Sequence, residues 1–312
     1  MDNKTEICIV GSGPAGYTAA IYGVRAGRKT ILVDGPVQGG QLTQTTVIEN
    51  FPGFPEGREG FDLMDDMRAQ AERVGATMMT GEVTGIDFDK RPFVVHIDSG
   101  ETIEAQAVII ATGATAKYLG LPDEKRLAGK GVSACATCDG FFFKGKDVAV
   151  VGGGDTAAEE ALYLAGLANK VYMIVRRDVL RASEAMCKRV FDNPKITVLF
   201  KHQTVSLEGE DKLEAAMLVT NKGEEGETMV RVPISGFFLA IGHKPNTEVF
   251  PEIETDGEGY IKTSGKGQTT NIEGVFAAGD VCDPTYRQAI TAAASGCRAA
   301  IDADRYLRAT GR

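Results

Sequence analysis

The 312-residue sequence predicts an α/β fold in which one strand–turn–helix–strand unit occurs twice. Apolar runs of strand length lead into glycine-rich turns at residues 11–16 and 152–157, and an alanine-rich, helix-forming segment follows each turn. The two units start about 140 residues apart, which indicates a duplicated unit and not a short-period repeat. Such a unit is typical of a Rossmann-like, three-layer domain that binds a dinucleotide.

The elements of the first unit follow in order along the chain. Strands are predicted at residues 7–10 and 30–33, with a helix to about residue 26 between them. Further strands are expected between residues 78 and 112, most clearly at 93–97 and 107–110.

The second unit repeats this order. Strands are predicted at residues 148–151 and 171–175, with a helix to about residue 168 between them. Residues 208–226, rich in glycine and charge, are interpreted as a strand–turn region of this unit. Near the end of the chain a strand at 275–278 precedes a helix over about residues 287–308.

The composition is that of a soluble globular protein, with 43% hydrophobic and 25% charged residues. A net charge of −9 argues against general nucleic-acid binding and against binding to an anionic membrane. No apolar run approaches the ~18 residues that span a bilayer, and residues 1–10 lack the pattern of a secretory signal. The sequence therefore predicts a cytoplasmic protein with no nucleic-acid or membrane partner.

The first turn has the spacing G-x-G-x-x-G, formed by Gly11, Gly13 and Gly16. Glycines at these positions allow backbone N–H groups to approach a pyrophosphate at a helix N-terminus. Asp34 ends the next strand, where its carboxylate can accept hydrogen bonds from the ribose hydroxyls of an adenosine. The alternative is a glycine-rich turn without a ligand.

The second turn has the related spacing G-x-G-x-x-A, formed by Gly152, Gly154 and Ala157. Where a site for NAD presents an acid, this chain has three arginines, Arg176, Arg177 and Arg181. Guanidinium groups suit the 2′-phosphate of NADP, although a solvated basic loop is the alternative. An acid at one site and arginines at the other indicate two different dinucleotides.

Cys135 and Cys138 form the one close cysteine pair among six cysteines, in the pattern C-x-x-C. A zinc half-site is one interpretation, but the three histidines lie far apart in sequence. A static disulfide across so short a loop is a second, and it is unexpected in the cytoplasm. A pair that cycles between dithiol and disulfide is the third, with Asp139 placed to manage the thiol protons. The isolated cysteines are interpreted as core residues: Cys8, Cys187, Cys282 and Cys297.

Together these motifs resemble the low-molecular-weight thioredoxin reductases over essentially the whole chain. The matching segments are residues 11–16 (GSGPAG), 39–42 (GGQL), 111–113 (ATG), 135–139 (CATCD), 152–157 (GGGDTA), the three arginines, 279–280 (GD) and 287–289 (RQA). The resemblance implies FAD on the first turn and NADPH on the second. It also implies an FAD domain of residues 1–115 and 246–312, into which an NADPH domain of residues 116–245 is inserted.

The resemblance further implies roles for single residues. Cys138 would face the flavin, Cys135 would attack the disulfide of thioredoxin, and Asp139 would be the acid/base. Asp280 would bind the ribityl chain, and the protein would be a homodimer. The residues expected to bind the two cofactors are Gly11, Ser12, Gly13, Pro14, Ala15, Gly16, Asp34, Gly35, Gly40, Gln41, Leu42, Asn50, Val83, Ala111, Thr112, Gly113, Gly152, Gly154, Asp155, Thr156, Ala157, Arg176, Arg177, Arg181, Ile241, Gly242, Gly279, Asp280, Arg287, Gln288 and Ala289.

One departure concerns the NADPH site, where many bacterial members have histidine before the arginine pair and this chain has Val175. Phe143, where tyrosine is frequent, is interpreted as a packing residue. Phe141 and Phe142 are either a contact for thioredoxin or buried core.

Because one flavin must serve both the disulfide and NADPH, rotation of the inserted domain is expected near residues 115–117 and 241–246.

Two other functions remain open from the sequence. A dithiol oxidase of a small metabolite would keep the cysteines and pass electrons to oxygen. A redox-sensing flavoprotein without turnover would bind flavin but consume no NADPH. Two related classes of reductase fit less well. A peroxiredoxin-linked reductase would carry an additional N-terminal dithiol domain, and a ferredoxin- or flavodoxin-NADP reductase would lack the cysteine pair.

Overall fold

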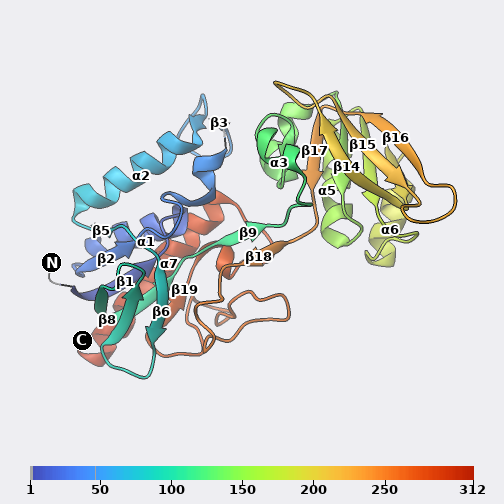
Figure 1. Cartoon of the computed structure of the whole chain (residues 1–312). Helices are drawn as coiled ribbons and strands as arrows, with labels where there is room; N and C mark the ends of the chain where they lie inside the picture. Colours follow the sequence, from blue (N-terminus) through green and yellow to red (C-terminus); the bar gives the residue numbers. More distant parts are fainter. Residues whose placement is uncertain (1–2, 46) are drawn as a thin grey trace. The chain divides into compact units, whose positions relative to one another are not determined.

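The computed structural model describes residues 3–45 and 47–312, and the chain divides into two compact units (Figure 1). The terminal unit comprises Met1–Thr115 and Lys244–Arg312, and the inserted unit comprises Ala116–His243. The predicted α/β class, with its parallel sheets, is confirmed.

The terminal unit is built on a seven-stranded sheet of order β5–β2–β1–β8–β7–β6, with β19 paired to β8. The pairs among β5, β2, β1, β8 and β19 are parallel, and β6, β7 and β8 are joined by antiparallel pairs. The strands are β1 (Lys4–Val10), β2 (Thr30–Val33), β5 (Thr77–Met79), β6 (Val83–Asp87), β7 (Phe93–Ile97), β8 (Thr102–Ile110) and β19 (Val275–Ala277). The short strands β3 (Val47–Ile48) and β4 (Arg58–Glu59) pair with each other.

Three helices pack against one face of this sheet: α1 (Pro14–Arg25), α2 (Gly60–Val74) and α7 (Ala289–Thr310). Alanines of α1 and α7 meet Ile7, Ile9 and Ile109 of the strands in one apolar cluster. The opposite face carries a second cluster that includes Phe250. The unit is therefore layered, and the ends of the parallel strands meet the N-terminus of α1.

The inserted unit is built on a parallel sheet of order β10–β17–β11–β12–β13. These strands are β10 (Val132–Ser133), β11 (Asp147–Val151), β12 (Lys170–Val175), β13 (Ile196–Phe200) and β17 (Gly236–Leu239). The helices α5 (Asp155–Leu167) and α6 (Glu184–Phe191) cover one face. An antiparallel sheet of β14 (His202–Glu208), β15 (Ala215–Thr220) and β16 (Thr228–Pro233) covers the other. The short helices α3 (Pro122–Arg126) and α4 (Ala136–Asp139) and the 3₁₀ turn η2 (Gly140–Phe143) complete the unit.

The chain passes between the units twice, in the paired strands β9 (Ala114–Ala116) and β18 (His243–Pro245). On the terminal side, the Asn246 side chain donates to the carbonyl of Thr112 at 2.8 Å, and the Thr112 hydroxyl donates to the carbonyl of Asn246 at 2.7 Å. On the inserted side, the Lys117 amide donates to the carbonyl of Gly242 at 3.0 Å. Each side of the crossing is thus anchored within its own unit.

Several predicted boundaries differ from the observed ones; the strand predicted at 7–10, for example, begins at Lys4. The strand predicted at 107–110 begins at Thr102, because its first half alternates between buried and half-exposed residues where it pairs with β7. The helix predicted from about residue 287 begins at Ala289, because Gln288 is its extended N-cap and Arg287 has φ 47°. Among the described residues, no helix is both long and apolar enough to cross a bilayer.

Candidate functional site

The first glycine turn joins β1 to α1, and its packing requires glycine at two positions. Gly11 has φ 108°, and a Cβ there would lie 2.4 Å from the carbonyl oxygen of Ala111. A Cβ on Gly16 would lie 1.9 Å from the carbonyl oxygen of Gly11. A Cβ on Gly13, in contrast, would meet no atom within 4 Å. The open side of the turn therefore lets a phosphate approach the N-terminus of α1.

Asp34, directly after β2, is a buried carboxylate with one oxygen left without a partner. Its exposed fraction is 3%, and Oδ1 has no hydrogen-bond partner in the structure. Oδ2 lies 3.4 Å from both Arg68 Nη1 and Thr80 Oγ1. Burial raises the pKa of Asp34, and the charge of Arg68 opposes this shift. A buried oxygen without a donor fits the ribose hydroxyls of a dinucleotide.

The segment after β2 returns to this turn. The Ser12 hydroxyl donates to the carbonyl of Asp34 at 2.7 Å and accepts from the Gly39 amide at 3.0 Å. A Cβ on Gly40 would lie 3.4 Å from Gly13 Cα, so the 3₁₀ turn Gly40–Gln44, which contains the predicted site residues Gly40, Gln41 and Leu42, lies beside the glycine turn. The Gln41 side chain donates to the carbonyl of Ala114.

The last part of the chain adds Gly279 and Asp280 to the same unit, in a 3₁₀ turn after β19. The Gly279 amide donates to Ser295 Oγ at 2.7 Å, which joins this turn to α7. Burial, and to a lesser extent the charge of Asp283, raises the pKa of Asp280 to about 6, although the charge of Arg287 opposes the shift. A carboxyl group held in this way can accept a hydrogen bond from a polyol hydroxyl.

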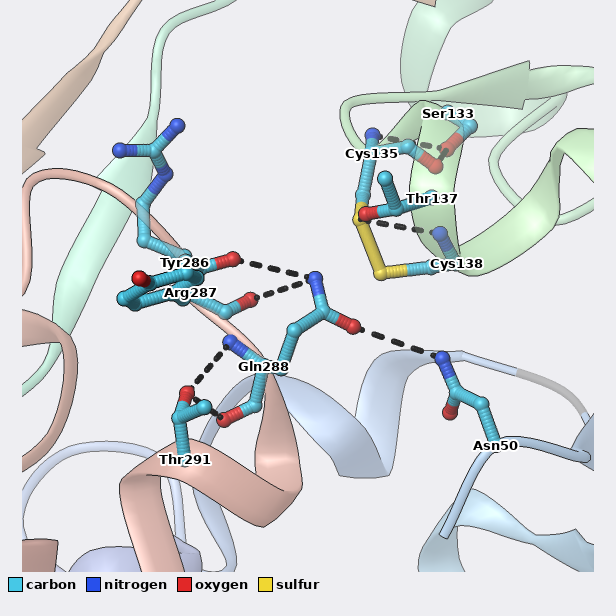
Figure 2. The surroundings of a disulfide bond; sticks show 9 residues. All are labelled: Asn50, Ser133, Cys135, Thr137, Cys138, Tyr286, Arg287, Gln288 and Thr291. Atoms are coloured by element: carbon cyan, nitrogen blue, oxygen red, sulfur yellow. Dashed lines mark hydrogen bonds between the residues drawn. A yellow bond between two sulfur atoms is a disulfide. The ribbon is translucent and has the colours of Figure 1, made fainter. Parts of the chain in front are cut away.

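The N-terminus of α7 is ordered by Gln288 (Figure 2). Its side-chain amide donates to the carbonyls of Tyr286 and Arg287 at 3.1 and 3.2 Å, and accepts from Asn50 Nδ2 at 3.4 Å. Asn50 and Gln288, both predicted site residues, are therefore brought together. Val83 is also a predicted site residue, but it differs from this polar pair. Its side chain is 3% exposed and packs in the apolar core.

The second glycine turn, between β11 and α5, reproduces the geometry of the first. Gly152 has φ 143°, and a Cβ there would lie 2.4 Å from the carbonyl oxygen of Ala240 and 2.8 Å from the Cβ of Ala157. A Cβ on Gly154 would meet no atom within 4 Å. This turn also has one open side suited to a pyrophosphate.

The loop that carries the predicted arginines contacts this second turn through Arg181. The Arg181 amide donates to the carbonyl of Gly153 at 2.6 Å, and Asp155 accepts from the amide and hydroxyl of Ser183 at 2.9 Å. Asp155 thus fixes the arginine loop to the start of α5. The exposed side chains of Arg176, Arg177 and Arg181 form no ion pair with any described residue. Their charge is available for a phosphate.

Cys135 and Cys138 form a disulfide at the start of α4 (Figure 2). Cys135 is the N-cap of this one-turn helix, and its sulfur accepts from the Cys138 amide at 3.2 Å. Ser133 Oγ accepts from the Cys135 amide at 3.0 Å and lies 3.3 Å from the Cys135 carbonyl oxygen. The two sulfurs are bonded, which agrees with a redox-active disulfide and with a static one, and no group of three metal-ligating side chains occurs in the part of the chain that the structure describes.

Asp139, at the end of α4, is half-buried. Burial raises the pKa of its carboxyl group, and a hydrogen bond from Ser133 opposes the shift. A carboxyl group whose pKa is moved toward neutrality is better suited to exchanging protons with thiols than an exposed one.

The three phenylalanines after the pair differ in environment. Phe141 and Phe142 are 60% and 40% exposed, so the alternative that they are buried core is wrong. Phe143 packs edge-on against Phe238, with ring centroids 5.4 Å apart, which agrees with its interpretation as a packing residue.

Four polar residues at these sites were not identified from the sequence: Arg68, Thr80, Ser133 and Thr137. Arg68 and Thr80 reach Asp34 only through the packing of α2 and β5. Ser133 and Thr137 flank Cys135 in sequence, and their spacing alone gave no signal that distinguishes them from other turn residues.

Comparison with known proteins supports this description. A family model described as "Pyridine nucleotide-disulphide oxidoreductase" matches residues 5–296. A thioredoxin reductase of Streptomyces coelicolor is 49% identical over 99% of this chain and 96% of its own length. A solved thioredoxin reductase from Streptococcus pyogenes has a TM-score of 0.93 at 35% identity, over 99% of this chain and 100% of that one. The thioredoxin reductase of Lactococcus lactis, in what its title calls the FR conformation, has a TM-score of 0.64 at 35% identity, over 98% and 99%.

Proposed function

Because the chain belongs to the pyridine nucleotide-disulphide oxidoreductase family, and within it to the thioredoxin reductases, we propose that it uses NADPH and FAD to reduce the disulfide of thioredoxin. The observation that carries the proposal is the Cys135–Cys138 disulfide in a chain with two open glycine turns. Electrons would pass from NADPH through FAD to this disulfide and then to thioredoxin.

FAD is assigned to the terminal unit. Its pyrophosphate would lie on the turn of Gly11 and Gly13, its ribose on Oδ1 of Asp34, and its ribityl chain on Asp280. A bound flavin would accept a hydride from NADPH and would supply two electrons for the reduction of the disulfide. The start of α7 at Gln288 would present backbone N–H groups to the ring system.

Replacing Asp34 with asparagine is expected to weaken FAD binding about tenfold, because an asparagine side chain has one acceptor oxygen where the carboxylate has two, and this neutral oxygen accepts a hydrogen bond more weakly. The measurement is the quenching of flavin fluorescence when apoprotein is reconstituted with FAD. Glu72→Gln is the matched control, since Glu72 pairs with Arg68 on its exposed side. Equal FAD affinity for Asp34→Asn and the wild type would contradict the ribose assignment.

NADPH is assigned to the inserted unit. The turn of Gly152 and Gly154 would hold its pyrophosphate, and Arg176, Arg177 and Arg181 would hold its 2′-phosphate. Val175 offers no polar contact at the position before the arginines, so the phosphate selectivity depends on the guanidinium groups.

The residues of the inserted unit then carry out the disulfide chemistry. Cys135 is assigned the attack on thioredoxin and Cys138 the side of the pair that faces the flavin. Asp139 would give a proton to a departing thiolate and take it back from a thiol, which its raised pKa supports. Phe141 and Phe142, both exposed, offer an apolar surface beside the pair for the incoming protein.

One flavin must meet both NADPH and the disulfide, so we place a rotation of the inserted unit at the β9–β18 crossing. The hydrogen bonds from Asn246 to Thr112 and from Lys117 to Gly242 anchor the chain on either side, which leaves residues 113–116 and 243–245 between the anchors.

A cross-link between β9 and β18 is expected to slow at least one half-reaction about tenfold while sparing the other. The two half-reactions are flavin reduction by NADPH and thioredoxin reduction by the reduced protein, each followed by stopped-flow absorbance. Full rates for both in the cross-linked protein would contradict the rotation.

The remaining assignments are a homodimer and a cytoplasmic location. The first experiment on the function compares two electron acceptors in separate reactions: oxidised thioredoxin without oxygen, and oxygen with a small dithiol as the electron donor. NADPH oxidation that requires oxidised thioredoxin supports the reductase, whereas NADPH-independent reduction of oxygen by a small dithiol would indicate the oxidase. Flavin absorbance without any NADPH oxidation would indicate the redox sensor.

A further inference from the structure

Two hydrogen-bond donors converge on the sulfur of Cys135 (Figure 2). The Cys138 amide donates to it at 3.2 Å, and Thr137 Oγ1 lies 3.4 Å away. A sulfur in a disulfide carries no proton, so the Thr137 hydroxyl is the donor of this contact. Both donors come from α4, for which Cys135 is the N-cap.

Ser133 fixes the backbone that holds this sulfur. Its Oγ accepts from the Cys135 amide at 3.0 Å, and its single proton can go to the Cys135 carbonyl, 3.3 Å away, or to the carboxyl of Asp139. Ser133 therefore links the orientation of Cys135 to the carboxyl group that exchanges protons with the pair.

We propose that Thr137 is a further catalytic residue and Ser133 a positioning residue, and that the Thr137 hydroxyl stabilises negative charge on the sulfur of Cys135. A hydrogen bond to an ionised acceptor is about twice as strong as one to a neutral acceptor, so these donors favour the thiolate over the disulfide sulfur. The role in turnover rests on the proposed function, but the stabilised charge does not require thioredoxin.

The steps at this sulfur balance. Two electrons from NADPH break the Cys135–Cys138 bond and leave a thiolate on Cys135 and a thiol or thiolate on Cys138. The Cys135 thiolate attacks one sulfur of the thioredoxin disulfide, which forms a mixed disulfide and releases the other sulfur as a thiolate that takes up a proton. Cys138 then attacks Cys135, which restores the Cys135–Cys138 disulfide and releases the second thioredoxin sulfur.

Other titratable groups act on the same sulfur, and their effects must be separated from that of the hydroxyl. Asp139 lies on α4 itself, and α4 packs against η2 and α5. The 3₁₀ turn η2 has no titratable residue, and those of α5 are Asp155, Glu159, Glu160 and Tyr163. The carboxylates among these groups disfavour a second negative charge, and all of the groups are the same in every Thr137 variant. A difference between Thr137 variants therefore reports the hydroxyl.

The test measures the pH midpoint of Cys135 alkylation in the reduced full-length protein carrying Cys138→Ser, which keeps the backbone amide at position 138. Iodoacetamide is the probe, and mass spectrometry of the peptide containing Cys135 separates its reaction from that of the other cysteines. Thr137→Val should raise the midpoint by about half a unit to one unit, since Thr137 is exposed and water competes for the contact. Thr137→Ser, which keeps the hydroxyl, should restore it.

Thr137→Ala is a second variant without the hydroxyl and should match Thr137→Val. Ser133→Ala should change the Cys135 midpoint and shift the pH profile of turnover, because it removes a partner of Asp139. With Cys138 intact, Thr137→Val should lower kcat about threefold to tenfold and leave flavin reduction by NADPH unchanged.

Equal alkylation midpoints for Thr137→Val, Thr137→Ala and Thr137→Ser would overturn the proposal. A shifted midpoint in a protein that cannot reduce thioredoxin would support the charge stabilisation and contradict the proposed function. The two ideas can therefore fail separately.

Discussion

Replacing either Cys135 or Cys138 with serine is expected to abolish NADPH-driven reduction of thioredoxin while FAD is still reduced by NADPH. A complete cycle of disulfide exchange needs both sulfurs, one to attack the partner and one to resolve the mixed disulfide, and a serine hydroxyl does neither at neutral pH. We expect a loss of turnover of at least about 10⁴-fold for each variant.

The two serine variants should nevertheless differ in one respect. Cys138→Ser keeps the attacking sulfur, so it should accumulate a mixed disulfide between Cys135 and thioredoxin, whereas Cys135→Ser should not. Non-reducing electrophoresis and mass spectrometry detect this product. Cys187→Ser is the matched control, because Cys187 is a free cysteine of the same unit and should leave turnover unchanged. A mixed disulfide through Cys138 would reverse the assigned roles.

The second large effect concerns the choice of nicotinamide cofactor. Replacing both Arg177 and Arg181 with glutamine is expected to raise the KM for NADPH about 100-fold and to leave the KM for NADH within about twofold of the wild type. The reason is that NADH lacks the 2′-phosphate, and neither guanidinium group forms an ion pair with a described residue that its loss would disturb.

The measurement is steady-state oxidation of NADPH and NADH with thioredoxin as acceptor. Arg189→Gln on α6 is the control, since Arg189 lies outside the loop of the three arginines. A parallel rise in both KM values would mean that the substitutions damage the fold of the loop, and unchanged values for both would place the phosphate elsewhere.

The parts of the site that follow local rules could be predicted from the sequence. Gly11 and Gly152 have positive φ and lie against backbone carbonyls, so glycine is the residue type that fits, and the spacing of the turn reveals both. The cysteine pair was equally visible, because two reactive groups three residues apart must lie close together.

The parts that depend on tertiary packing could not be predicted. Arg68 contacts Asp34 across 34 residues of sequence, and nothing in the pattern of α2 distinguishes this half-buried arginine from the exposed ones. Arg287 has φ 47° although it is not glycine, so the start of α7 was placed two residues too early. Phe141 and Phe142 are exposed, whereas the next residue, Phe143, packs against Phe238. This difference also depends on packing within the inserted unit.

The central claim is that this chain passes electrons from NADPH to the disulfide of thioredoxin. The most direct measurement mixes the FAD-loaded protein with NADPH and an excess of oxidised thioredoxin in the absence of oxygen, and counts both the NADPH oxidised and the thiols formed. The account predicts two new thioredoxin thiols for each NADPH, at a rate that saturates with thioredoxin concentration. No thiol formation with NADPH or NADH, in a protein that has bound its flavin, would contradict it.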